Sequence, residues 1–314
     1  MDPVLIVAPI ILALASIATP FGGVLVRYRV LYTPNPGIQI QEDVQNREGL
    51  HVGYFTIMKR VIRIEGWAGL FKGFIPTLGF VLFVFVLMST LPRQKYPDPN
   101  LALIFPPKSI AVIFFGVLAG LPLEILKIRL ELIFYRAIVT SHKLSILGFR
   151  NSLKVLLTPY ERRRPWTLYT APGLVLAFIL LLVIRTAFLV ATLWFLVPIL
   201  LRPEERQNPL FTGTIIGYSL SFLALAIIIA PLEVIVIRLS VQRNFGDETS
   251  STSSEVEPLL ESSHPREDVS EHDTMAPYTG LVDTVRKIGD EEGWKTLFRG
   301  WKISLMLPHY LIYQ

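Results

Sequence analysis

Charge distribution is the feature of this sequence that most constrains its fold. Five stretches contain no charged residue, and four of them reach the roughly 20 residues that an α-helix needs to cross the hydrocarbon core of a bilayer. These stretches are residues 3–26, 73–92, 109–123, 165–184 and 209–232. The third is extended by further apolar residues, and the fourth continues after one arginine. Together with the apolar C-terminus, they predict six membrane-crossing helices, of which the last is incomplete.

A large soluble protein with buried helices is the simplest alternative. The chain is 52% hydrophobic with a mean hydropathy of +0.50, and soluble domains are already roughly 45–50% apolar. Composition alone therefore separates the two classes poorly. So many long charge-free stretches exceed what soluble cores use, and we predict an all-α membrane protein.

The basic residues are concentrated in two loops, which predicts an orientation in the membrane. The loops after the first and third apolar stretches are rich in Arg and Lys. The connections at residues 93–108 and 202–208 are short and also carry Asp98, Glu204 and Glu205. By the positive-inside rule, the long loops lie on the inner face and both termini on the other. The net charge of +5 fits contact with anionic lipid better than nucleic-acid binding.

A proline at the end of an apolar run, followed seven positions later by an arginine, occurs three times. The prolines are Pro20, Pro122 and Pro231, which lie 102 and 109 residues apart. Three repeats are therefore expected, at residues 1–100, 101–205 and 206–314. Each repeat also contains a segment with an apolar stripe and several bases, a pattern typical of a helix at the membrane interface. These segments are residues 53–66, 149–157 and 280–293.

These patterns make the chain resemble the mitochondrial carrier family. The family signature is Pro-x-acid-x-x-base-x-base at the end of each odd-numbered helix, followed later by acid-Gly, an aromatic residue, a base and Gly. The first part is complete at Pro122, Glu124, Lys127 and Arg129, partial after Pro231 and reduced after Pro20. The second part is strong at residues 65–73 and 292–300 and weak at 165–173. The resemblance implies six tilted helices around a central cavity, in three pseudo-symmetric two-helix repeats that each carry a short interfacial helix.

The resemblance also implies site residues. The signature prolines would kink the odd-numbered helices, and the acid of one repeat would pair with the base of a neighbour to close a matrix gate. The charged gate residues present are Glu124, Lys127 and Glu233, the motif glycines are Gly73, Gly173 and Gly300, and the substrate-contact positions seven residues further on are Phe80, Leu180 and Leu307. Arg185, alone in the fourth apolar stretch, matches a cavity-facing arginine of many carriers. An arginine bonded to neighbouring helix carbonyls is the alternative for it, because a charge at that depth needs water, protein or an anion.

The chain departs from the family at most gate and contact positions. Gly22, Leu25 and Val236 replace charged residues, so the six gate positions allow at most one ion pair. The three contact positions are all apolar, although recognition of a charged metabolite needs placed polar groups. The matrix gate is therefore expected to be weakened.

Two functions remain open at this point. The first is transport of a small solute by alternating access in the inner mitochondrial membrane, with Arg185 contacting an anion. The second is a degenerate carrier that has lost transport and acts as a scaffold or adaptor in the outer mitochondrial membrane, in fusion or lipid-contact machinery. The resemblance favours transport, and the missing gate residues favour the scaffold. An anionic lipid such as cardiolipin is the expected membrane partner in either case.

No residue pattern predicts catalysis, a metal or a cofactor. The chain has no cysteine, and its five histidines lack metal or triad spacing. No phosphate-binding loop or dinucleotide fingerprint is present. We therefore expect a protein that is not an enzyme. Residues 246–274, rich in Ser, Thr, Glu and Asp, predict a disordered insertion that could bind a protein partner.

Overall fold

Every element that the structure describes is helical. The computed structural model describes residues 3–33, 53–72, 74, 78, 125–140, 149–192, 209–244 and 277–306. The α-helices are α1 (Pro3–Val30), α2 (Tyr54–Glu65), α3 (Trp67–Leu70), α6 (Phe149–Leu156), α7 (Pro159–Arg163), α8 (Leu174–Ala191), α10 (Pro209–Val241), α11 (Leu281–Glu291) and α12 (Trp301–Met306), with 3-10 helices η2 (Pro165–Leu168) and η7 (Trp294–Phe298). Residues 125–139 form a further helix. The prediction of an all-α protein is confirmed for these parts of the chain.

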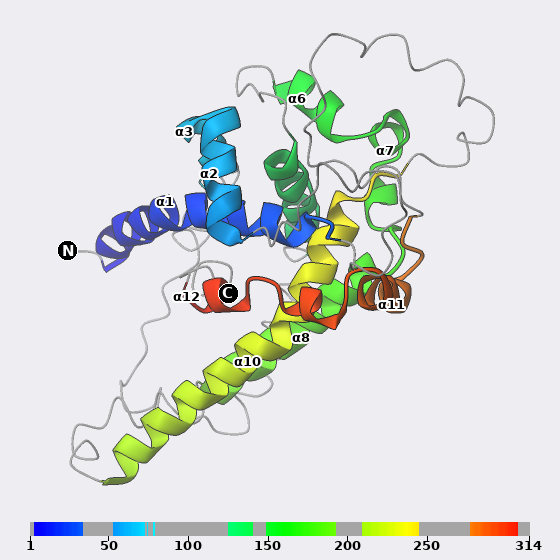
Figure 1. Ribbon diagram of the computed structural model, residues 1–314. Helices are drawn as coiled ribbons and strands as arrows, with labels where there is room; N and C mark the ends of the chain where they lie inside the picture. Colours follow the sequence, from blue (N-terminus) through cyan, green and yellow to red (C-terminus); the bar gives the residue numbers. More distant parts are fainter. Residues whose placement is uncertain are drawn as a thin grey trace, which may run out of the picture.

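The longest element is α10, which lies alongside α8 (Figure 1). Aromatic contacts of Phe188 with Tyr218 and Phe222, and the shared core of Phe178 with Val234, show that the two helices are antiparallel. Leu, Ile, Val, Ala and Phe make up nearly all of α8 and most of α10, and each helix has few charged residues, so neither carries a strongly polar face.

One helix in the described parts is long and apolar enough to cross a membrane. It is the segment Thr212–Val241, with a mean hydropathy of 2.7, and Leu174–Phe188 is a shorter apolar helix. The second and third charge-free stretches of the sequence lie almost wholly outside the described residues. Six membrane-crossing helices therefore stay a prediction.

Two of the signature prolines lie inside described helices. Both α1 and α10 continue through their prolines, Pro20 and Pro231, and the yellow C-terminal part of α10 runs at an angle to the longer part before it (Figure 1). A bend is expected there because a proline removes one backbone hydrogen bond and its ring crowds the preceding turn. Pro122 lies outside the described residues.

The three amphipathic segments are helical, as α2, α6 and α11. In α2, Ile57 and Val61 are buried and Ile64 is exposed, so the buried stripe is narrower than the sequence suggests. In α11, Ile288 is buried and Val282 is exposed. Figure 1 shows α2, α6 and α11 around the end of the molecule where α1, residues 125–139 and α10 come together.

The core is concentrated at that same end. Val26 and Val30 of α1, Ile138 and Ile237 form one buried cluster that joins the three apolar helices. A larger cluster packs α8, α11, η2 and η7 around the C-terminal half of α10. The earlier half of α10 exposes Ile215, Ile216 and Leu220 instead.

Candidate functional site: three arginine clasps and a shared carboxylate

Three arginines near helix ends are almost fully buried. Arg27, Arg136 and Arg238 are 4%, 6% and 0% exposed. Each donates its Nε–H to a backbone carbonyl of a different apolar helix, and the distances are similar. Arg27 donates to Ile138 at 2.9 Å, Arg136 to Ser240 at 2.9 Å and Arg238 to Arg29 at 3.1 Å. The three bonds form a cycle, in which α1 binds the end of residues 125–139, that helix binds the end of α10, and α10 binds the end of α1.

Each of these arginines also forms an ion pair with a glutamate 25 to 54 residues further along the chain. Arg27 Nη2 lies 2.8 Å from Glu65 Oε2, and Arg136 binds both oxygens of Glu161 at 2.7 and 2.9 Å. Arg238 also binds both oxygens of Glu292, with Nη2 to Oε2 at 3.0 Å. We call each arginine with its glutamate an arginine clasp. Because every guanidinium is neutralised and its donors are used, these charges can be buried at an acceptable cost.

The glutamates extend the cycle to the chain beyond each helix end. Glu292 accepts from the backbone N–H of Thr33 at 3.0 Å, and Glu161 accepts from that of Asn244 at 3.1 Å. In the first clasp, Lys72 binds Glu65 at 2.9 Å and donates to the Thr140 carbonyl at 2.7 Å. Each clasp therefore fixes both the last turn of the neighbouring helix and the residues that follow it.

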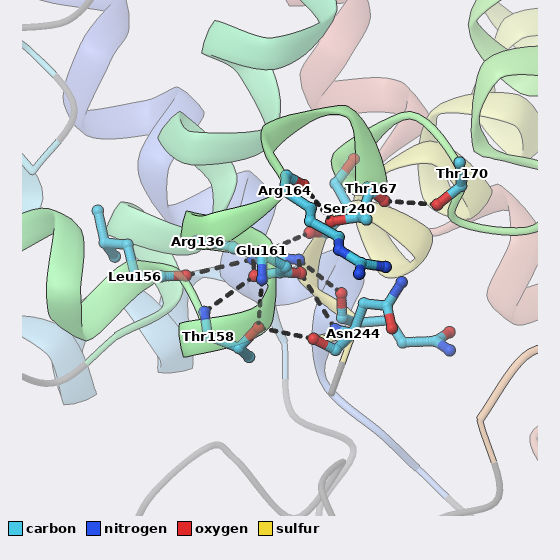
Figure 2. A network of polar contacts seen from close by, with 10 residues as sticks. Arg136, Leu156, Thr158, Glu161, Arg164, Thr167, Thr170, Ser240 and Asn244 are labelled. Atoms are coloured by element: carbon cyan, nitrogen blue, oxygen red, sulfur yellow. Dashed lines mark hydrogen bonds and ion pairs between the residues drawn. The ribbon is translucent and has the colours of Figure 1, made fainter. Parts of the chain in front are cut away.

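The middle clasp has a second layer of hydrogen bonds (Figure 2). Thr158 accepts from the Glu161 N–H at 3.1 Å, and Glu161 accepts from the Thr158 N–H at 3.0 Å, which is a capping box at the start of α7. The Thr158 hydroxyl also donates to the Asn244 carbonyl at 2.6 Å. Burial by itself would raise the pKa of Glu161, but hydrogen bonds and charge from Arg136, with the Thr158 and Asn244 amides, hold that pKa below its usual value.

The middle clasp uses a different arginine from the one that the signature indicates. By spacing from the prolines, Arg129 corresponds to Arg27 and Arg238. In the structure, Arg136 occupies that place, seven residues and about two helical turns later. The sequence contains a second, overlapping match here, since Leu130-Glu131 and Arg136 repeat the spacing of Leu232-Glu233 and Arg238. Residues seven apart share a helix face, so sequence alone does not separate the two registers.

Two motif glycines lie at close contacts between segments that are far apart in the sequence. Gly300 has φ +78°, and a Cβ there would lie 2.3 Å from Leu25 Cδ1. Gly173 has φ +80°, and a Cβ there would lie 2.3 Å from the Leu281 backbone nitrogen at the start of α11. Both positions therefore need glycine for backbone angle and for space. Gly73 lies outside the described residues.

A second charge cluster lies between α1, α8 and α10. Glu233 of α10 accepts from Arg29 Nη2 at 2.6 Å and from Arg185 Nη2 at 3.1 Å. Arg29 also donates to the Ser304 hydroxyl at 2.6 Å, which brings α12 into the cluster. Two arginines share one carboxylate, so the four side chains together carry a net charge of +1. We call these residues the shared-carboxylate cluster.

Some of the predicted gate and contact residues belong to this cluster, and others lie elsewhere or outside the described residues. Glu233 and Arg185 are brought together, whereas Lys127 lies partly buried on the helix of residues 125–139. Leu180 of α8 is 37% exposed. Glu124, Phe80 and Leu307 lie outside the described residues, as do residues 246–274.

Sequence reasoning missed Arg29 as a partner of Glu233. The prediction considered only the six signature positions, where Leu25 stands in place of the base. Arg29 lies four residues after Leu25, so it occupies the same helix face one turn later. The four-residue spacing between Leu25 and Arg29 could therefore have indicated a substitute base one turn after the signature position.

Metal binding finds no support in the described parts of the chain, where no group of three or more His, Cys, Asp or Glu side chains could hold an ion.

Comparison with protein-family models, with curated proteins and with solved structures gave no match. The carrier resemblance therefore stays a prediction from the signature residues.

Proposed function

We propose that this protein is a carrier-like membrane transporter that moves a small anionic solute by alternating access, in the inner mitochondrial membrane. The observation that carries the proposal is the shared carboxylate: Glu233 binds Arg29 and Arg185 at once. A solute anion can bind a guanidinium in the same way as a carboxylate does, so an arginine that already binds Glu233 is a suitable contact for an anionic solute.

The geometry suggests how binding and movement could be linked. Arg185 side-chain exposure is 23%, compared with 5% for Arg29, so Arg185 is the arginine that a solute reaches more easily. An anion on Arg185 would compete with Glu233 for the guanidinium. Glu233 would then lose the Arg185 guanidinium, and this ion pair between α8 and α10 would be broken. The protein would then have two arrangements, one in which Arg185 binds Glu233 and one in which it binds the solute. A solute that binds the second arrangement better shifts the equilibrium towards it.

The test is uptake by the purified full chain in liposomes, preceded by a thermal-shift screen with inorganic phosphate, dicarboxylates, nucleotides and amino acids. We expect one anionic class to raise the melting temperature and to exchange across the bilayer. Arg185→Ala should abolish both effects, and Arg185→Lys should retain part of them because a lysine keeps the charge. Arg286→Ala is the matched control, since Arg286 is 82% exposed and pairs only along its own helix in the described contacts.

Transport would be contradicted if no class stabilised the protein and none was exchanged. A scaffold function would then be the better proposal, and one observation favours it. The three arginine clasps join the helix ends through the chain's own side chains and carbonyl groups, an arrangement that a structural role would use. Protease accessibility of a terminal tag in intact mitochondria would place a scaffold in the outer membrane and a transporter in the inner one.

A further inference from the structure

Three tryptophans at corresponding positions of the repeats are exposed. Trp67, Trp166 and Trp294 are 71%, 62% and 60% exposed. Each is the first or second residue of a short helix, namely α3, η2 and η7. Tryptophan is usually well buried in folded proteins, so three large exposed rings at related sites need an explanation.

Each short helix is packed against the core beside its exposed ring. In each one, a leucine two or three residues after the tryptophan is buried: Leu70 in α3, Leu168 in η2 and Leu297 in η7. The backbone that carries each tryptophan is therefore held in place, although the ring itself is largely exposed. In the third repeat the ring lies across α11, because a Cβ on Gly289 would lie 3.0 Å from Trp294 Cε2. The three rings therefore lie on segments that are packed against the rest of the protein.

Each of the three tryptophans lies close in sequence to a clasp. Trp67, Trp166 and Trp294 follow the clasp glutamates Glu65, Glu161 and Glu292 by two, five and two residues. Because the clasps join the ends of α1, residues 125–139 and α10, the short helices that carry the rings begin close to these helix ends. The exposed apolar band of α10 and α8 lies further along the bundle.

Exposed bases and apolar side chains accompany every ring. The first repeat exposes Phe55, Lys59, Arg63 and Ile64, the second exposes Lys154, Val155, Arg162 and Arg163, and the third exposes Val282, Lys295 and Phe298. An apolar ring with a polar N–H, flanked by cations, matches the boundary between acyl chains and anionic headgroups.

We propose that Trp67, Trp166 and Trp294 are three anchors that seat the clasp end of the protein in the headgroup region of a bilayer. This inference rests on the proposed membrane location and is independent of transport. Three contact points define a plane, so the anchors fix the tilt as well as the depth of the bundle. A protein partner that covers the rings is the competing explanation, and the experiment separates the two.

The test is depth-dependent fluorescence quenching in vesicles of phosphatidylcholine with anionic phospholipid. Single-tryptophan versions of the full chain keep one of the three, with the other tryptophans changed to phenylalanine. Lipids brominated near the carbonyl end of the acyl chain should quench each ring at least about twofold more than lipids brominated near the methyl end. Quenching by aqueous acrylamide with none by either lipid would overturn the proposal and indicate a surface open to a protein partner. No solute is present, so a failure of transport leaves this result unchanged.

A second measurement covers the case in which single-tryptophan versions fail to fold. The chain contains no cysteine, so Trp67→Cys, Trp166→Cys or Trp294→Cys can be spin-labelled with every other residue intact. Accessibility to oxygen and to an aqueous nickel complex should place all three labels at the same shallow depth. A label on Ser253→Cys, in the polar segment 246–274 that the sequence predicts to be disordered, is the aqueous control. Three labels as accessible to nickel as this control would also overturn the proposal.

Discussion

Arg238 donates its Nε–H to the carbonyl oxygen of Arg29 over 3.1 Å, although the two residues are 209 apart in the sequence. The same guanidinium binds Glu292 through its other nitrogens, with Nη2 to Oε2 at 3.0 Å. One side chain of α10 therefore joins the last turn of α1 to the glutamate that follows α11. Its counterparts, Arg27 and Arg136, do the same for the other two junctions.

Removing one member of a clasp should be strongly destabilising. Arg238→Ala leaves the Glu292 carboxylate buried without its main partner, and breaking such a pair costs about 3–5 kcal/mol. We expect a lower melting temperature and a lower yield in detergent. Arg286→Ala is the matched control and should change stability by less than about 0.5 kcal/mol, because surface ion pairs contribute little. Similar losses in both variants would show that the clasp is not the cause.

Exchanging the two charges of a clasp should not restore stability. In Arg136→Glu with Glu161→Arg, an ion pair could form again, but the Ser240 carbonyl would lose its Nε–H donor and the Asn244 N–H its acceptor. The double variant should therefore unfold at a temperature close to that of the worse single variant. Full recovery would mean that charge pairing alone stabilises this junction.

The middle clasp predicts a loss of stability in acid. The pKa of Glu161 lies below its usual value of 4.5 in the folded chain, because the bonds from Arg136 and two backbone amides outweigh the effect of burial. A carboxylate with a lowered folded pKa contributes stability above pH 4.5, and this contribution is lost as the pH falls through the folded pKa. The difference in melting temperature between wild type and Glu161→Gln should therefore narrow below pH 4.5. A constant difference from pH 7 to pH 3 would contradict this account.

Replacing Gly300 or Gly173 with alanine should destabilise the protein. Gly300→Ala adds a Cβ at a positive φ and against Leu25, so we expect a loss of about 2–4 kcal/mol from backbone strain and overpacking together. Gly173→Ala should be at least as costly, because its nearest atoms belong to the backbone of α11. Gly217→Ala, inside α10 with open space around its Cβ, should be neutral or stabilising by about 0.5–1 kcal/mol. The melting temperatures of the three variants test this prediction, which fails if Gly300→Ala and Gly173→Ala melt at the same temperature as Gly217→Ala.

The segment between Gln242 and Tyr278 should be removable. The Gln242 side chain donates to the Tyr278 carbonyl at 3.3 Å and accepts from the Tyr278 N–H at 3.2 Å, so both sides of the segment are joined at one point. Replacing residues 246–274 with a short Gly-Ser linker should leave the melting temperature nearly unchanged, because loop closure depends only weakly on length. The same replacement combined with Gln242→Ala should be less stable. A collapse of the first variant would show that the fold needs this segment.

The sequence predicted the helices better than the contacts between them. Charge-free runs and amphipathic stripes located α1, α8, α10, α2 and α11, because apolar periodicity is a local property. It also singled out Glu233 and Arg185. It could not place Arg136, since two matches seven residues apart present the same helix face. It also gave Arg27 and Arg238 no ion-pair partner, because the glutamates that bind them lie 38 and 54 residues away and are brought to them only by the fold.

The cyclic order of the clasps has a consequence for biosynthesis. The last turn of α1 and the residues after it bind Arg238, Glu292 and Arg299, which are translated more than 200 residues later. During translation, the polar groups at this helix end are therefore left to water until those residues have emerged. A nascent chain that stops before Glu292 lacks two of these three partners.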